Sequence, residues 1–124
     1  MTETRLKDLD KEIEANKVAL ENLETERKKD IRLEDEVLDL TGIINSNLRE
    51  LSYMPLSQSR EESLMNELDG LQRLTKTLDG HFRDRDAYYQ KTKQSLLDKG
   101  EELSYEKKRT LRSIEEKKGD KTNG

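Results

Sequence analysis

Two long stripes of apolar residues, separated by a single interruption, dominate the pattern of this 124-residue chain. The first runs from Leu6 to Leu51 with apolar residues every three or four positions, and the second runs from Leu64 to Leu103. This spacing places the apolar residues on one face of an α-helix. The interruption, residues 54–59, contains the only proline. Because two helical stripes cover each other only when the chain folds back, the pattern predicts an all-α fold, a long antiparallel two-helix hairpin like a coiled coil.

The ends of the two predicted helices follow from the same pattern. We expect the helices at about residues 3–53 and 60–116, within a hairpin domain that covers residues 1–118. Pro55 ends the first helix because the residue before a proline is forced out of the helical region. Residues 119–124 carry no apolar stripe, so we expect a disordered tail there.

Two further signals concern the second helix. Ser59 and Glu62 have the spacing of a capping box, in which a hydroxyl and a carboxylate satisfy two backbone amides at the start of a helix. Gly80 lowers helix stability by about 1 kcal/mol relative to alanine. The sequence therefore leaves open whether the second helix runs through Gly80 or breaks there.

The apolar stripe of the first helix changes position in its middle. Near Arg27 the apolar residues shift to Ile31 and Leu33, as an eleven-residue period would make them do. The stripe is then wider than one seam between two helices needs, and Leu33, Leu40 and Ile43 stay partly uncovered. This width predicts that a further helix, contributed by a protein partner, packs against the hairpin.

Folding about the proline turn also predicts which residues face each other. Antiparallel geometry pairs residues whose numbers add to about 113. Gly42 then faces Gly70 or Leu71, and two facing glycines would let the helices approach closely. Asn16 faces residues 96–97. These pairs give the register of the hairpin in a form that a structure can check.

Charged residues interrupt both stripes at the same predicted level. Polar groups in the seam of a coiled coil set register and partner choice at a cost in stability, and here each charge has an opposite charge within reach. The cluster could instead form a polar socket for a partner or hold a metal ion, but register setting is favoured. The predicted register-setting layer consists of Arg27, Asp30, Arg83, Arg85 and Asp86.

The aromatic residues offer a possible anchor for a partner. Tyr88 and Tyr89 are neighbours, about 100° apart on a helix, and cannot both face the same surface. One of them is available to a partner, for which tyrosine supplies a large contact area and a hydrogen-bonding tip, unless both serve ordinary packing. The candidate partner-binding residues are Leu33, Leu40, Ile43, Phe82, Tyr88 and Tyr89.

The composition separates a helical hairpin from other classes of chain. Only 30% of the residues are hydrophobic and 42% are charged, which is too few apolar residues for a compact core but enough for a narrow seam. Disordered chains have a similar composition, and the regular apolar spacing favours order. The formal net charge of −4 argues against nucleic acid as a partner.

The residue types exclude most chemistry. The chain has no cysteine, hence no disulfide, thiol nucleophile or thiolate metal site. His81 is the only histidine, and one imidazole forms neither a metal-ligand set nor a nucleophile–base pair. A two-helix hairpin also lacks a pocket. We therefore expect no enzyme, no catalytic, metal or cofactor-binding residues, and a function in protein binding.

Three segments resemble a known family. Residues 51–57 at the turn, residues 62–70 and the stretch from residue 82 to residue 108 are similar to the small α-helical partner proteins associated with LXG-domain toxins of the type VII secretion system in Gram-positive bacteria. The resemblance implies a non-enzymatic adaptor or targeting chaperone. Such a protein binds the helical amino-terminal region of the toxin, often with a second small helical protein, and helps to present the toxin for secretion.

The chain also departs from related secretion proteins. It has no tryptophan, hence no Trp-x-Gly turn, and Tyr105 is followed four residues later by Arg109 where an acidic residue would be expected. Phe82 and Asp86 match an F-x-x-x-D pattern of a companion partner family, a pattern short enough to arise by chance. An export signal of the protein's own is therefore not indicated.

Localisation and assembly state are the remaining expectations. The amino terminus does not resemble a signal peptide and no apolar run is long enough to span a bilayer, so we expect a cytoplasmic protein, and the sequence leaves open whether it is exported together with its cargo. The alternative function is a self-associating structural coiled coil, a homodimeric four-helix bundle in which two hairpins cover each other's extra apolar stripe. Neither partner nor stoichiometry follows from the sequence.

Overall fold

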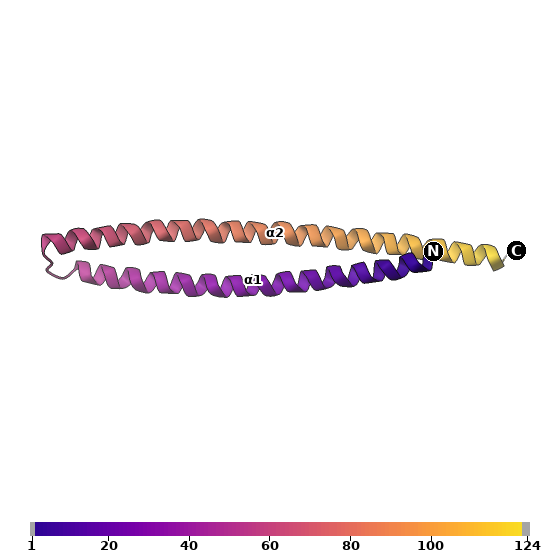
Figure 1. Cartoon of the computed structure of the whole chain (residues 1–124), viewed down its shortest axis with the longest axis horizontal. Coiled ribbons are helices and arrows are strands. Elements are labelled where there is room, and N and C mark those ends of the chain that lie inside the picture. Colours follow the sequence, from indigo (N-terminus) through magenta and orange to yellow (C-terminus); the bar gives the residue numbers. More distant parts are fainter. Residues whose placement is uncertain (1, 123–124) are drawn as a thin grey trace. The chain divides into compact units, whose positions relative to one another are not determined.

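The structure, a computed structural model, describes residues 2–122, and side chains are described for residues 2–119. In this part of the chain there are two α-helices, α1 at Thr2–Ser52 and α2 at Gln58–Thr122, and no strands. The helices pack against each other in antiparallel orientation (Figure 1), which confirms the predicted all-α helical hairpin. Their contacts divide the chain into two units. We call Arg27–Tyr88 the turn unit, and Met1–Glu26 with Tyr89–Gly124 the end unit.

The second helix begins two residues earlier than predicted. The backbone N–H of Arg60 donates to Ser57 Oγ at 3.4 Å, and the N–H of Glu61 donates to the carbonyl of Ser57 at 2.9 Å. Ser57 is therefore the capping residue, and the predicted capping box of Ser59 and Glu62 is wrong. Ser57 is the first hydroxyl residue after Pro55, so the helix starts at the first cap that the chain offers.

Replacement of Ser57 by alanine is expected to lower the free energy of unfolding by about 1 kcal/mol, because an N-terminal amide of α2 loses its acceptor. Ser59→Ala is the matched control, since Ser59 lies inside the helix and its change should be neutral or slightly stabilising. Urea unfolding followed by circular dichroism measures both. An equal loss in the two variants would contradict the assignment of the cap.

The second helix also ends later than predicted. It continues through Thr122 rather than stopping near residue 116. Glycines often end helices by adopting the left-handed conformation, but Gly119 has no positive φ, and neither has Gly80. The helix thus runs unbroken through Gly80, and the predicted tail is helical at residues 119–122. The rest of that prediction, residues 123–124, lies outside the described residues.

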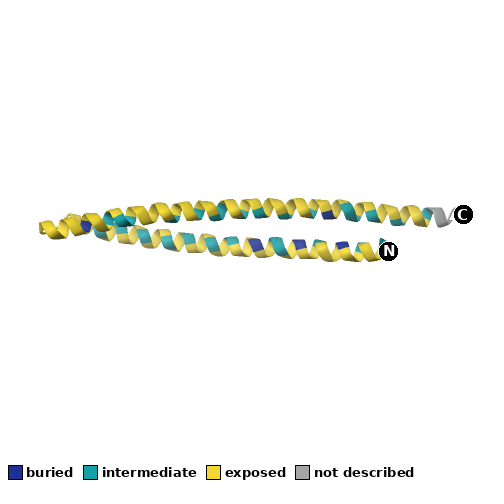
Figure 2. Cartoon of the chain, turned by 45° about the horizontal axis from the view of Figure 1, so that its top comes forward, coloured by how far each residue is buried: buried dark blue, intermediate teal, exposed yellow. Residues whose placement is uncertain are grey.

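The seam between the helices, defined as their line of buried and half-buried positions, keeps one heptad register along α1 (Figure 2). Every seventh residue from Leu6 is half-buried, including Arg27 and Glu34. Ile31 and Leu33 lie outside the seam and are exposed. The predicted shift of the stripe in mid-helix is therefore wrong. The helix does not rotate to bury these apolar residues, because partners on α2 satisfy the charges of Arg27 and Asp30 in the seam.

The end unit contains most of the buried apolar side chains of the described residues and one buried polar group. Leu9, Leu23 and Leu103 are buried there. Asn16, 9% exposed, donates from Nδ2 to the carbonyl of Leu96 at 3.0 Å, which confirms that it faces residues 96–97. A buried amide with one specific acceptor favours a single register, because any slip would leave it without a hydrogen bond.

Ion pairs flank this buried seam of the end unit. Arg5 pairs with Glu106 at 2.7 Å, and Asp10 pairs with Lys107 at 2.7 Å. The hydrogen bond to Glu106 raises the pKa of the Arg5 guanidinium above its usual value. All four side chains are well exposed, so these pairs contribute little to stability and mainly support the alignment of the two helices.

The glycines near the turn do not serve the close approach predicted for them. A Cβ built on Gly42 or on Gly70 would meet no atom within 4 Å. Gly42 is exposed next to the seam residue Thr41, and Gly70 is half-buried next to Leu71. The alternative in which two facing glycines let the helices approach closely is therefore wrong, because a side chain would have room at either position.

Candidate partner-binding face

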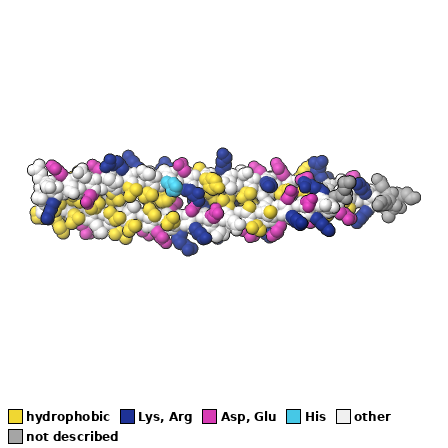
Figure 3. Space-filling model, viewed as in Figure 1, with side chains coloured by type: hydrophobic (Ala, Val, Ile, Leu, Met, Phe, Trp, Pro, Cys, Tyr) yellow, Lys and Arg dark blue, Asp and Glu magenta, His cyan; other side chains and the backbone are white. Residues whose placement is uncertain are grey.

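The turn unit exposes a group of large apolar side chains that the hairpin itself does not cover. We call this group the outer apolar face. Its members are each between 50% and 59% exposed: Leu33, Leu40, Ile43, Leu74 and Tyr88. In the space-filling view, hydrophobic side chains gather over both helices of this unit, on the side that carries the single histidine (Figure 3). Charged side chains separate the apolar ones over the end unit in the same view.

Heptad positions explain why these residues share one side. Leu33 and Leu40 are seven residues apart, and each precedes a seam position of α1. Leu74 and Tyr88 are fourteen residues apart and share one heptad position, which at Tyr88 directly precedes the half-buried Tyr89. In an antiparallel pair, the residues that precede equivalent seam positions of the two helices fall on the same side. Ile43 lies three residues after Leu40 and continues that side by one turn.

The structure divides the predicted partner-binding residues into two groups. Leu33, Leu40, Ile43 and Tyr88 lie on the outer apolar face, whereas Phe82 and Tyr89 are half-buried in the seam. Tyr88 is thus the outward member of the tyrosine pair, and the guanidinium of Arg85 lies 5.5 Å from its ring centroid.

Sequence reasoning did not select Leu74 as a partner-binding residue. The signal was present, because Leu74 has the same heptad position as Tyr88. It becomes visible only once the seam of α2 is known.

The opposite side of the turn unit has a different character. A shallow groove there is lined by Leu38 and Met65 together with polar side chains, among them Asn45, Arg49 and Gln72. Tyr53, Leu68 and Leu71 also line this groove, but two charged groups of α2 and one of α1, Asp69, Lys76 and Arg49, lie among its apolar side chains. The two sides of the hairpin are therefore not equivalent, and the outer apolar face is the better candidate for a protein interface.

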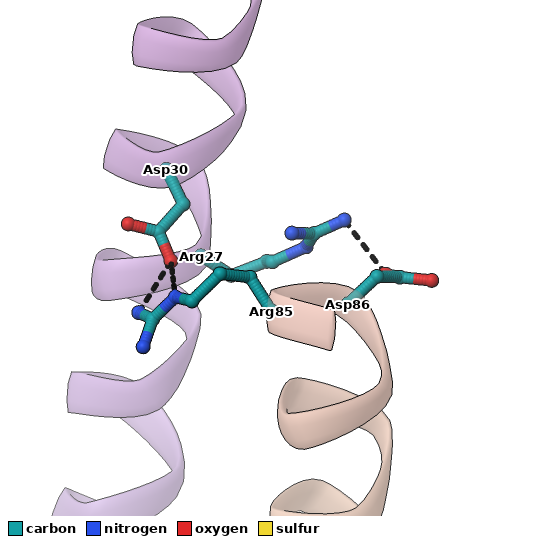
Figure 4. Close-up of polar contacts among 4 residues, drawn as sticks. All are labelled: Arg27, Asp30, Arg85 and Asp86. Carbon is teal, nitrogen blue, oxygen red and sulfur yellow. Dashed lines mark hydrogen bonds and ion pairs between the residues drawn. The ribbon is translucent and has the colours of Figure 1, made fainter. Parts of the chain in front are cut away.

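The predicted polar layer forms two ion pairs across the seam (Figure 4). Arg27 Nη2 lies 2.7 Å from Asp86 Oδ1, and the Arg27 side chain is only 16% exposed. Arg85 donates to Asp30 Oδ2 from Nε at 3.2 Å and from Nη2 at 2.6 Å. The partly exposed pairs stabilise the fold by at most about 1 kcal/mol each, so their main effect is on alignment.

One predicted member does not belong to this layer. Arg83 pairs instead with Asp79 of its own helix at 3.6 Å, and its side chain is 83% exposed. The two pairs across the seam join residues whose numbers add to 113 and 115, which agrees with the predicted register of about 113.

The fold and this face define a helical-hairpin protein with one exposed apolar side in its turn unit. Comparisons with protein families, curated proteins and solved structures gave no match to the chain. In residues 2–122 neither helix contains a stretch long and apolar enough to cross a membrane. Function must therefore be inferred from the outer apolar face and from the residues that carry the family resemblance.

Proposed function

We propose that this protein is a non-enzymatic adaptor that binds the helical amino-terminal region of an LXG-type toxin and helps to present that toxin for type VII secretion. The outer apolar face is the observation that supports it. A soluble hairpin that leaves five large apolar side chains half or more exposed on one side is suited to bind another protein there.

The arrangement of the face favours a helical partner. Its side chains come from two antiparallel helices, and those of α1 are spaced by seven and by three residues, as the contacts of a packed helix are. A partner helix with apolar residues every three or four positions would lie along both rows and complete a three- or four-helix bundle. Burial of the exposed parts of the face would favour binding by several kcal/mol, on the order expected for side chains of this size.

The type of partner is supported by the resemblance alone. Two of the three resembling segments, residues 51–57 and 62–70, fall in the turn unit, and the third, residues 82–108, begins there and continues into the end unit. Tyr53 and Met54 within the turn are 87% and 57% exposed and are available for contact. Because the outer apolar face lies in the turn unit as well, we expect the toxin to contact that unit.

The small number of buried apolar side chains is consistent with a protein that works in a complex. In the described residues only Leu9, Leu23, Leu64 and Leu103 are buried apolar side chains. A binding partner would add apolar burial that the chain alone lacks.

Co-expression with the amino-terminal region of an LXG toxin, followed by affinity purification and titration calorimetry, tests the proposal. Leu40→Asp should remain folded and weaken binding at least about 10-fold, because it places a charge in the centre of the face. Leu38→Asp, on the opposite side of the same helix, is the matched control and should bind normally. Wild-type protein that ignores the toxin, or equal binding by the Leu40→Asp variant, would refute the proposal.

A further inference from the structure

The outer apolar face is complementary to itself. We propose that a second copy of this chain covers it, forming a parallel homodimer in which both turns lie at the same end and α1 of each copy packs against α2 of the other. The two-fold axis then runs along the helices. The inference goes beyond the adaptor function, because it concerns the protein before any partner is present.

The register of the turn unit aligns the apolar residues for such a dimer. Residues whose numbers add to about 114 lie level with one another, as the two ion pairs of the polar layer show. Leu40 and Leu74 obey this rule. A two-fold axis parallel to the helices exchanges α1 and α2 without changing level. Leu40 of each copy therefore meets Leu74 of the other, and four leucines form one layer.

The side chain of Ile43 also matches the open space at Gly70 across the two-fold axis of the proposed dimer. Ile43 is 59% exposed and stands three residues beyond Leu40. Gly70 lies level with it on α2, and a Cβ on Gly70 would meet nothing within 4 Å. In the dimer, Ile43 of one copy lies over Gly70 of the other and fills this space, as a knob fills a hole.

Charges at the border of the face are complementary in the same arrangement. Asp39 and Arg73 lie nearly level on the two helices, as do Arg32 and Asp84, and all four are exposed. Within the described residues none of the four takes part in an ion pair. Across the axis Asp39 faces Arg73 and Arg32 faces Asp84, so that each pair joins opposite charges at both symmetric sites.

An antiparallel dimer does not satisfy these conditions together. If the copies ran in opposite directions with Leu33 of one opposite Leu40 of the other, the two copies of Glu36 would lie against each other. A shift that brings Asp39 opposite Lys29 removes this repulsion but places Leu40 beside charged residues. The parallel arrangement matches both the leucines and the charges in one alignment.

The area of the face suits a dimer of ordinary size. A standard interface buries about 800 Å² on each side, of which roughly 450 Å² is apolar. At roughly 100–150 Å² for a fully exposed apolar side chain, the five members of the face offer on the order of 350 Å². The flanking polar residues and their aliphatic stems supply the remaining buried area of the interface. A second copy could therefore cover the face in a stable complex.

Disulfide trapping tests the dimer directly, because the chain contains no cysteine. An equimolar mixture of Ile43→Cys and Gly70→Cys proteins should form a cross-linked dimer under mild oxidation, whereas Ile43→Cys alone should not, since its two copies lie on opposite edges. Gly80→Cys, at a second glycine of α2 whose Cβ would also meet no atom within 4 Å, is the matched control and should not cross-link to Ile43→Cys. Equal cross-linking in all mixtures would refute the proposed arrangement.

Light scattering and a charge exchange provide the second measurement. The wild-type protein at about 100 μM should have the mass of a dimer, and Arg73→Glu should weaken the dimer about 10-fold. Asp39→Arg in the same chain should restore it, because the pair is then reversed rather than broken. A monomeric wild type, or a double variant as weak as Arg73→Glu, would overturn the proposal.

A final experiment separates the homodimer from the adaptor function. Only this experiment rests on the proposed function. If the toxin uses the same face, its helical region should displace the second copy of the chain. The homodimer should then be replaced by a complex in which the toxin covers the outer apolar face. A monomer that binds the toxin would refute the dimer alone. A dimer that forms as described but ignores the toxin would refute the adaptor function alone.

Discussion

Leu64→Asp is expected to unfold the turn unit, lowering the free energy of unfolding by more than about 3 kcal/mol. Leu64 is 7% exposed and is the one buried apolar side chain among the described residues of this unit. The substitution removes that apolar contact and places a carboxylate where water is excluded. Thermal unfolding by circular dichroism and amide exchange of residues 27–88 measure the effect.

Met65→Asp is the matched control for this prediction. Met65 follows Leu64 on the same turn of helix but is 59% exposed. A charge there remains in water, so the free energy of unfolding should change by no more than about 0.5 kcal/mol. If both variants lost stability equally, the seam of α2 would not pass through Leu64 as described.

Gly100→Ala is expected to destabilise the end unit by about 1 kcal/mol, the opposite sign from an ordinary helix. Alanine normally gains about 1 kcal/mol over glycine in a helix interior. At this position the new Cβ would lie 2.8 Å from Asn16 Oδ1. The buried amide of Asn16 is held by its hydrogen bond to Leu96, so it can move only by losing that bond. Urea unfolding measures the difference.

A double-mutant cycle tests the cause of this effect. In an Asn16→Ala background nothing opposes the new methyl group, and Gly100→Ala should then stabilise by about 1 kcal/mol. Gly80→Ala is the control in the wild-type background, because a Cβ there meets no atom within 4 Å. It should stabilise by a similar amount. A stabilising Gly100→Ala in wild type would show that Asn16 adjusts without cost.

The register was predictable because one turn and two continuous stripes leave few ways to pair the helices. A single proline marks the turn, and a short loop then determines which residues face each other. The hydrogen bond from Asn16 to Leu96 and the pairs Arg27–Asp86 and Asp30–Arg85 confirm that reasoning. To predict such pairs, it is enough to know how far each residue lies from the turn along its helix.

Errors arose where rotation about the helix axis or competition between neighbours decided the outcome. Arg83 and Arg85 are two residues apart, and only the rotation of α2 places Arg85 across from Asp30 while Arg83 pairs with Asp79 of its own helix. Ser57 and Ser59 compete for the same capping role, and local backbone geometry selects the first. The division of the partner-binding candidates between seam and face has the same origin.

The sequence by itself determined the hairpin, its turn and which residues of the two helices lie opposite each other. Apolar spacing and the single proline suffice for this, because they act on the local conformation of the chain. The sequence also indicated that Leu33, Leu40 and Ile43 stay uncovered, whereas only the tertiary structure decided that Leu74 and Tyr88 lie with them and that Phe82 and Tyr89 lie in the seam. Charges occupy the seam at Arg27 and Asp30 and are satisfied across it, so α1 keeps its register and Leu33, Leu40 and Ile43 stay exposed. That choice depends on contacts between the two helices, which no single stripe contains.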